Sequence, residues 1–211
     1  ILAGMNAEAP GDAAGISGSG PIRIAADPVL SVGTILSAVG ALCEERNLRI
    51  EVVRPGRLSR PDILLKILRG NSLPGSRGQF ALVPLPRRIL AASPASIERR
   101  GLTIAPEYLE RQHILRIDGD EAPIEQMGPA GEEAQLLREL PPPAFLLPDA
   151  GALLESTLTG EGLAAGLSRL DAEKALSSGQ LIQVLPEWVF PEEHLALELS
   201  SEREDARALA A

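Results

Sequence analysis

The stretch GEGLAAGLSRLDAEKALSSGQLIQVLPEW, from Gly160 to Trp188, is the part of the chain that decides the fold. Its apolar residues predict a strand at Gly162–Leu167, followed by a helix that Asp171 caps and Gly179 ends. A second apolar strand is expected at Leu181–Leu185. A strand, a capped helix, a glycine turn and another strand in this order are typical of an α/β domain.

An earlier stretch, RRILAASPASIERRGLTIAPEYLERQHILR from Arg87 to Arg116, has a related pattern. It holds a strand (Arg88–Ala92) that runs into the letters ASP, a short helix, a Gly-hydrophobic-Thr turn and a Pro-Glu-x-Leu helix start at Pro106. A histidine, His113, then precedes the strand Ile114–Ile117. Together, the two stretches resemble the effector-binding domain of LysR-type transcriptional regulators.

The first residues after the N-terminal tail fit that resemblance, because GPIRI is similar to the Gly-x-Leu-Arg-Ile strand that opens the family's domain. Ile22–Ala25 predicts a strand, Leu30–Glu45 a helix with one apolar face, and Leu48–Val53 a second strand. A βαβ unit of this kind implies a parallel pair of strands with the helix packed on the sheet. The expected fold class is α/β, with two Rossmann-like subdomains joined by two crossover strands in a type 2 periplasmic-binding-protein-like arrangement.

The apolar positions of the first helix recur at the helical period, so this face is expected to pack on the sheet. They are Val32, Ile35, Leu36, Val39, Leu42 and Cys43.

The chain is expected to leave one subdomain, build the second, and return. Residues 1–20 are rich in Gly, Ala and Ser and are interpreted as a linker or tail. Subdomain I is assigned to residues 21–90 and 195–211, and subdomain II to residues 91–194. The crossings are the strands 88–92 and 195–199, and two such connections form a hinge around a cleft.

The segment PDILLKILR, Pro61–Arg69, leaves two alternatives. Pro61 suits the first position of a helix, Asp62 the first turn and Arg69 the last, so the local signals favour a helix. The family resemblance implies a strand from Asp62 instead, with Lys66 where the family has an arginine. A strand is expected at Gln79–Leu85 under either alternative.

The second subdomain is expected to contain a long irregular segment at residues 118–143, with one short strand pair. Asp149 is expected to cap a helix at Ala150–Leu158. A helix is also expected at the C-terminus, at Arg203–Ala210.

The composition excludes several classes of function. The formal net charge is −9, there are two lysines, and aromatic residues make up 2% of the chain, so neither phosphate backbones nor base stacking is favoured. No segment of the sequence is apolar enough to span a bilayer. The single cysteine excludes an internal disulfide and fits a cytoplasmic protein.

Catalytic and metal-binding patterns are missing from the sequence. Cys43 is expected to be a small core residue on the first helix, and His113 to be structural. Neither His113 nor His194 has a nucleophile or a metal-ligand partner at a motif spacing. Catalytic residues, metal sites and cofactors are therefore all predicted to be absent. The glycines of GISGSG precede a strand instead of following one, which excludes a dinucleotide loop.

The best candidate for a binding site is the turn Ala26–Thr34, at the carboxyl end of the first strand, where parallel α/β sheets bind ligands. Its backbone N–H groups and the hydroxyls of Ser31 and Thr34 suit a carboxylate or a phosphate, whereas Ser31 as a simple helix cap is the alternative. Asp27 counts against a strongly anionic ligand unless its side chain faces away. The family resemblance implies effector contacts at Ser31, Val32, Ser93 and Asp149. The predicted effector-binding residues are Ala26, Asp27, Ser31, Val32, Thr34, Ser93 and Asp149.

The resemblance implies a ligand-sensing domain rather than an enzyme. A small-molecule effector would bind between the subdomains, and DNA would be bound only by an N-terminal domain that this sequence lacks. The family also implies a homodimer, and a tetramer at full length, in which Leu30–Glu45 of one subunit lies antiparallel to Ala150–Leu158 of the other. A periplasmic solute-binding protein of the same architecture is the alternative, and an enzyme on this scaffold is the third hypothesis.

Overall fold

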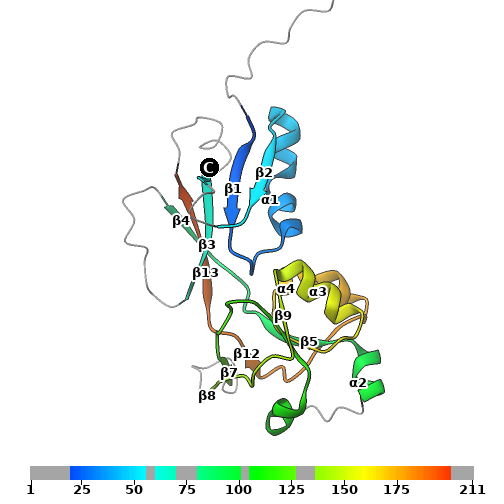
Figure 1. Cartoon of the computed structure of the whole chain (residues 1–211). Coiled ribbons are helices and arrows are strands. Elements are labelled where there is room, and N and C mark those ends of the chain that lie inside the picture. The colour runs from blue at the N-terminus through cyan, green and yellow to red at the C-terminus, as the bar shows by residue number, and fades with distance from the viewer. Residues whose placement is uncertain (1–19, 56–59, 70–79, 101–104, 127–135, 201–211) are drawn as a thin grey trace, which may run out of the picture.

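The computed structural model describes residues 20–55, 60–69, 80–100, 105–126 and 136–200 (Figure 1). These residues form two β-sheets, one above the other in the view of Figure 1, with α-helical structure beside each. We call the sheet that contains the first strands lobe I, and the sheet built from the middle of the chain lobe II. The linker assigned to residues 1–20, apart from Gly20, and the helix expected at Arg203–Ala210 lie outside the described residues.

Lobe I is a five-stranded sheet with one helix. Its elements are β1 (Ile22–Ala26), α1 (Val32–Arg46), β2 (Ile50–Val53), β3 (Ile63–Arg69), β4 (Phe80–Pro84) and β13 (Glu193–Leu199). The strand order is β2-β1-β3-β13-β4. β1 is parallel to β2 and β3, which confirms the βαβ prediction, whereas β13 runs antiparallel to both β3 and β4.

Lobe II is an eight-stranded sheet with helices α3 and α4 packed together on one side of it (Figure 1). Its elements are β5 (Ile89–Ala92), α2 (Pro94–Arg100), the 3₁₀ helix η1 (Pro106–Arg111), β6 (Ile114–Ile117), β7 (Ile124–Gln126), β8 (Leu136–Arg138), β9 (Phe145–Leu147), α3 (Ala150–Leu158), β10 (Leu163–Leu167), α4 (Arg169–Ser177), β11 (Ile182–Gln183) and β12 (Trp188–Val189). The main strand order is β8-β7-β12-β5-β10-β6-β9.

Several sequence predictions are confirmed in lobe II. The helix at Ala150–Leu158 has the predicted bounds and the predicted cap, since Asp149 Oδ1 accepts a hydrogen bond from Ala152 N at 2.9 Å. The short strand pair expected within residues 118–143 is β7 with β8, which are antiparallel. The strand expected at Leu181–Leu185 is shorter than predicted, because only Ile182 and Gln183 pair with β5.

The core of lobe II is centred on β5. All four of its residues are completely buried, with Ile89 and Ala91 in the cluster beneath α3 and α4, and Leu90 and Ala92 in the cluster on the opposite face. Side chains of a strand alternate between faces, so a strand that is apolar throughout is buried on both sides. β5 is therefore the central strand on which the rest of lobe II packs.

The prediction of a helix at Pro61–Arg69 is wrong, because residues 63–69 of this segment form the strand β3. Its residues pair with β1 on one side and with β13 on the other, along seven consecutive positions for β13. Ile63 and Leu65 alternate with more exposed residues and join the lobe I core. The helix signals were local, whereas a strand in the middle of a sheet gains its stability from two neighbours that are distant in sequence.

The apolar face of α1 is only partly covered by its own lobe, contrary to the prediction. Ile35 is buried against the sheet, but Val32 is 51% exposed and Leu36 is 49% exposed. Cys43 is half-buried instead of lying in the core. The sheet covers only one side of the helix. Because the apolar residues of α1 extend beyond that side, some of them stay exposed to solvent.

The structure shows why the strand in the Gly160–Trp188 stretch contains a glycine, Gly166. It interrupts the register of β10 with β5 and has φ +92°, a backbone conformation that favours glycine. A Cβ at this position would lie 2.6 Å from Arg88 Nη1 and 3.1 Å from Asp120 Oδ2. The glycine thus creates the room for a buried arginine beside β10.

Candidate functional site

Three helices begin where the two lobes meet. α1 follows β1 in lobe I, whereas α3 and α4 follow β9 and β10 in lobe II. The lobes touch directly at these starts, since Ala150 N of α3 donates to the carbonyl of Pro28 at 2.9 Å. Carboxyl ends of parallel strands and N-termini of helices are where α/β folds bind ligands, so this junction is the candidate site.

The predicted turn, Ala26–Thr34, forms one wall of this junction. Asp27 Oδ1 accepts a hydrogen bond from Val29 N at 3.0 Å, so part of its carboxylate is used within its own turn. Ser31 is the N-cap of α1, and its Oγ accepts from Thr34 N at 3.0 Å. The capping role that the sequence suggested for Ser31 is therefore present, and the hydroxyl also reaches beyond its own helix.

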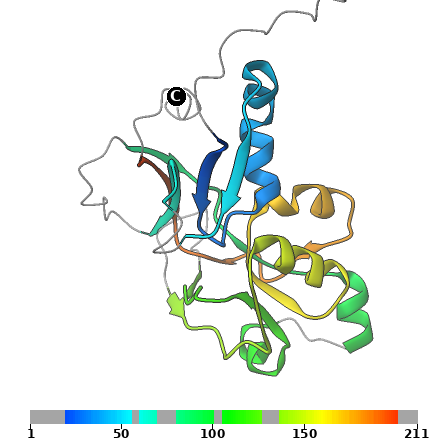
Figure 2. The same ribbon diagram turned by 45° about the horizontal axis from the view of Figure 1, so that its top comes forward.

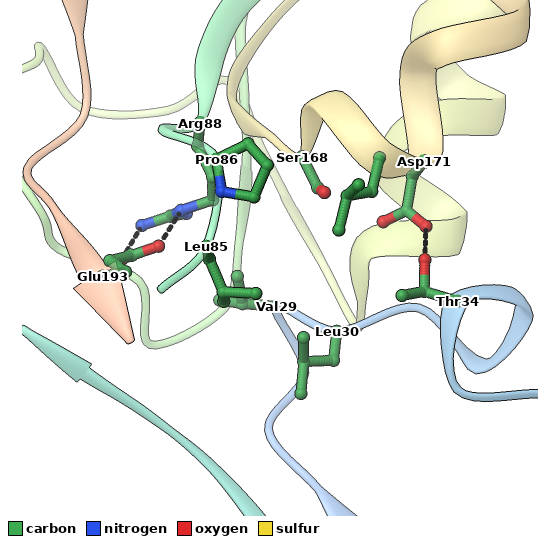
Figure 3. Close-up of a pocket in the computed structure, with 10 residues that line it drawn as sticks. Val29, Leu30, Thr34, Leu85, Pro86, Arg88, Ser168, Asp171 and Glu193 are labelled. Carbon is green, nitrogen blue, oxygen red and sulfur yellow. Dashed lines mark hydrogen bonds and ion pairs between the residues drawn. The ribbon is translucent and has the colours of Figure 1, made fainter. Parts of the chain in front are cut away.

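Asp171 meets those hydroxyls from the other lobe. Its Oδ1 accepts hydrogen bonds from both Ser31 Oγ and Thr34 Oγ1 (the Thr34 bond is drawn in Figure 3). The prediction that Asp171 caps its own helix is wrong, because the N-cap of α4 is Ser168 and Asp171 lies in the first turn. The sequence suggested that a ligand would bring a carboxylate to the start of α1. In the structure, the carboxylate at this position belongs to Asp171 of the protein itself.

A small cavity of about 20 Å³ lies beside this contact (Figure 3). Its lining combines both lobes: Val29, Leu30, Thr34, Leu85, Pro86, Arg88, Ser168, Leu170, Asp171 and Glu193. A cavity of this size has room for about one water molecule. The two lobes are therefore packed closely beside the contact of Asp171 with Thr34.

The structure does not bring all the predicted site residues together. Asp149 lies beside the turn, where Arg54 Nη2 is 3.8 Å from its Oδ2 and the next residue contacts Pro28. Ala26 is buried in the lobe I core, and Val32 lies on the half-exposed face of α1. The three predicted site residues Ala26, Val32 and Asp149 are therefore all close to the start of α1.

Ser93 is separated from that group. It follows the last residue of β5 and is buried, where its Oγ accepts from Ser96 N at 3.3 Å. Arg88, at the opposite end of β5, lines the junction between the lobes. Five residues of extended chain span roughly 16 Å, so Ser93 lies at the far end of the strand from the cleft.

A buried network of charges lies at the hinge, and it was not predicted from the sequence. Arg88, which precedes the first crossing strand, is 2% exposed, and Glu193, which begins the second crossing strand, is also 2% exposed. Arg88 binds Glu193 with two hydrogen bonds, from Nε to Oε2 at 2.8 Å and from Nη2 to Oε1 at 2.7 Å (the pair is drawn in Figure 3). A bidentate pair of this kind fixes the relative orientation of its two partners.

Two further groups close the network. Asp120 of lobe II accepts from Arg88 Nη1 at 2.5 Å, and Arg69, the last residue of β3, donates to Asp120 at 2.7 Å and to Glu193 at 2.9 Å. Arg88 also lies 4.7 Å from the ring centre of Phe190. The network therefore joins both crossings to a strand of lobe I and a loop of lobe II.

The electrostatics of the network favour its ionised form. Burial alone would raise the pKa of Asp120, but the hydrogen bond and charge of Arg88, with Arg69 and Arg116, hold that pKa below its ordinary value. Burial lowers the pKa of Arg88, and its bonds to Asp120 and Glu193 outweigh that effect and raise it. The one signal in the sequence was a charged residue at the start of each crossing strand, Arg88 before β5 and Glu193 in β13.

The residues of the described ranges do not meet the requirements of a metal site. Among these residues, no group of three or more His, Cys, Asp or Glu side chains is arranged to hold a metal ion. Burial, with a smaller effect from Glu44, raises the pKa of the Cys43 thiol, which disfavours the reactive thiolate. Within the part of the chain that the structure describes, no helix has the length and apolarity needed to cross a bilayer.

Comparisons with known proteins identify the fold. No family model and no curated protein matches the sequence. The structure resembles the regulatory domain of AphB from Vibrio vulnificus (TM-score 0.67, 15% identity, covering 90% of this chain and 96% of that one). It also resembles the regulatory domain of CrgA, a LysR-type transcriptional regulator from Neisseria meningitidis (TM-score 0.67, 18% identity, covering 90% and 95%). A third match is the effector domain of the transcriptional regulator AmpR from Pseudomonas aeruginosa (TM-score 0.59, 18% identity, covering 90% of each chain).

These neighbours define the class of fold. The chain has the fold of the regulatory, effector-binding domains of LysR-type regulators, which is the type 2 periplasmic-binding-protein-like arrangement that the sequence predicted. The full-length AphB structure from Vibrio cholerae also matches, and there the chain covers 66% of the neighbour. The neighbours named here are transcriptional regulators and not enzymes.

Replacing Asp120 by Asn should strongly destabilise the protein. The substitution leaves Arg88 and Arg69 facing a neutral amide, and breaking a buried ion pair from one side costs about 3–5 kcal/mol. Urea unfolding at pH 7 measures this loss. Asp118→Asn, an exposed carboxylate two residues away, is the matched control and should change stability by less than about 0.5 kcal/mol.

The same pair of variants tests the pKa of Asp120. Because this pKa is lowered by folding, its contribution is fully present above the unfolded value of about 3.9 and is lost as the pH falls through the lower folded value. The stability difference between the parent and Asp120→Asn should therefore shrink only below about pH 4. A difference that is constant down to pH 2 or so would contradict the assignment.

Proposed function

We propose that the chain is the ligand-sensing domain of a LysR-type transcriptional regulator, and that a small effector binds between its lobes. The observation that carries the proposal is the architecture: two lobes joined by two crossings, with three helix N-termini at the junction, in a fold that matches regulatory domains over 90% of the chain. The effector would contact Ser31, Thr34 and Asp149, with Asp27 and Val32 at the edge of the site. Such a ligand shifts the balance between lobe arrangements by binding one of them more tightly.

The chemistry of the junction supports an effector with an anionic group. Hydroxyls and N–H groups at a helix start favour a carboxylate or a phosphate, and Asp171 shows a carboxylate in this position. The aromatic content of 2% argues for a small aliphatic anion over a large ring system. In the regulator, the change in lobe arrangement would alter the placement of DNA-binding domains carried by the full-length protein, in the cytoplasm.

We also propose that the domain forms a homodimer through α1 and α3, with the two helices of different subunits antiparallel. Both helices lie on the same side of the molecule (Figure 2). Large apolar side chains are exposed on α1, α3 and the edge strand β9: Val32, Leu36, Phe145, Leu146 and Leu158. An interface between two subunits would cover these exposed apolar side chains.

A thermal-shift screen against a metabolite library tests the sensing proposal. A ligand present at 100 times its Kd stabilises a protein by about 2.7 kcal/mol, which corresponds to a rise in Tm of roughly 5–10 °C for a domain of this size. Small carboxylates should be enriched among the hits.

The thermal shift that a hit produces in two variants then tests where the effector binds. Thr34→Val, which keeps the Ser31 cap of α1, should reduce the shift that a hit produces. Ser93→Ala is the control, because it also removes one hydrogen-bonded hydroxyl, in this case one that accepts from a backbone N–H at the far end of β5. A hit whose shift is lost in Ser93→Ala and kept in Thr34→Val would contradict the site, and a library without any hit would count against the sensing role.

Sedimentation of the domain tests the dimer. The parent is expected to be dimeric at micromolar concentration, and Leu36→Glu is expected to make it monomeric, because the charge would be buried against the other subunit. Val83→Glu, on the edge strand β4 of lobe I, is the matched control, since Val83 is 49% exposed as Leu36 is. A parent that sediments as a monomer well above micromolar concentration would refute the interface.

A further inference from the structure

The contact between α1 and α4 is the least expected feature of the junction. One carboxylate oxygen, Asp171 Oδ1, accepts from two hydroxyls that belong to the opposite lobe. These two hydroxyl oxygens are 3.2 Å apart, so they form a compact pair of donors. Asp171 is separated from them by 140 and 137 residues in sequence, and its position therefore depends on how the lobes are arranged.

The side-chain hydrogen bonds of Asp171 are with the opposite lobe and not with its own helix. An acidic residue in the first turn usually interacts with the N–H groups of its own helix. Here Ser168 is the N-cap residue of α4, without a capping hydrogen bond from its side chain, and the hydrogen bonds from side chains to Asp171 come from Ser31 and Thr34 of lobe I. The carboxylate also lies near the positive end of the α1 dipole, which favours a negative charge there.

We propose that Asp171 is a built-in clamp that closes the cleft: its carboxylate takes the place of an anionic ligand at the start of α1, and an effector reaches Ser31 and Thr34 only by displacing it. The proposal rests on the sensing function proposed above and adds how the same cleft is regulated. It accounts for the small size of the cavity beside the Asp171 contact, about 20 Å³, which is too small for a metabolite.

The clamp also limits which ligands can act. A group held within the same molecule competes at an effective concentration of about millimolar or more, without any loss of translational freedom. A free carboxylate that contacts only the two hydroxyls cannot displace Asp171 at micromolar concentration. An effective ligand therefore needs an anionic group together with further contacts to the protein.

Distances between spin labels on the two lobes test the clamp directly. Labels are attached at Glu45→Cys on α1 and Glu173→Cys on α4, both exposed positions, in a Cys43→Ser background and diluted with unlabelled protein. Asp171→Ala should lengthen or broaden the distance distribution between the lobes. Thr34→Val should shift it in the same direction, since it removes one hydroxyl and leaves the backbone cap of α1 in place. Glu155→Ala, an exposed acidic residue of α3, should leave it unchanged.

Acetate provides a second measurement on the same variants. Added to Asp171→Ala, acetate should raise Tm more than chloride at equal ionic strength, because it occupies the two vacated hydroxyls, whereas the parent should respond equally to both salts. Unchanged distances in both Asp171→Ala and Thr34→Val, or equal effects of acetate and chloride on Asp171→Ala, would overturn the clamp. Because no effector is used, either result is independent of whether a metabolite binds.

Discussion

The pairing of Arg88 with Glu193 is the interaction on which the arrangement of the two lobes depends. Each residue stands at one of the two places where the chain passes between the lobes, and both are almost completely buried. A buried guanidinium is tolerated only when opposite charges and hydrogen bonds replace its water, so the two crossings must lie side by side. Asp120 and Arg69 extend this requirement to lobe II and lobe I, and Gly166 leaves the space that the arginine fills.

The hinge and the candidate cleft are neighbours in space. The small cavity between the lobes is lined by Arg88 and Glu193 on one side and by Thr34 and Asp171 on the other (Figure 3). A ligand that separated Thr34 from Asp171 would therefore change the surroundings of the charge network directly. This closeness gives a physical route from binding to lobe arrangement without a long chain of intermediates.

Much of the fold could be predicted because its signals are local or periodic. The cap and bounds of α3, the βαβ unit around α1 and the apolar strands β5 and β10 all follow from residue patterns within about ten positions. β3 could not be identified in this way, because its strand character comes from β1 and β13. The sequence allowed either a helix or a strand in this segment, and the local signals favoured the helix, which is wrong.

The candidate site was predictable only in part. The turn at Ser31 and the cap at Asp149 lie near each other, as expected from the order of strands and helices. Asp171 was identified as a helix-start residue, but its reach to the opposite lobe depends on packing between segments more than 130 residues apart. The Arg88 network was missed for the same reason, since no single segment contains both members of any of its pairs.

A double-mutant cycle on Arg88→Met and Glu193→Gln tests most directly whether this pair holds the crossings together. Each single variant leaves a buried group without its partner and should lower the free energy of unfolding by about 3–5 kcal/mol. The double variant should lose less than the sum of the two, with an interaction energy at the upper end of the usual range of about 0.5–3 kcal/mol. Losses that simply add, measured by urea unfolding at pH 7, would show that the two crossings are held in place by something else.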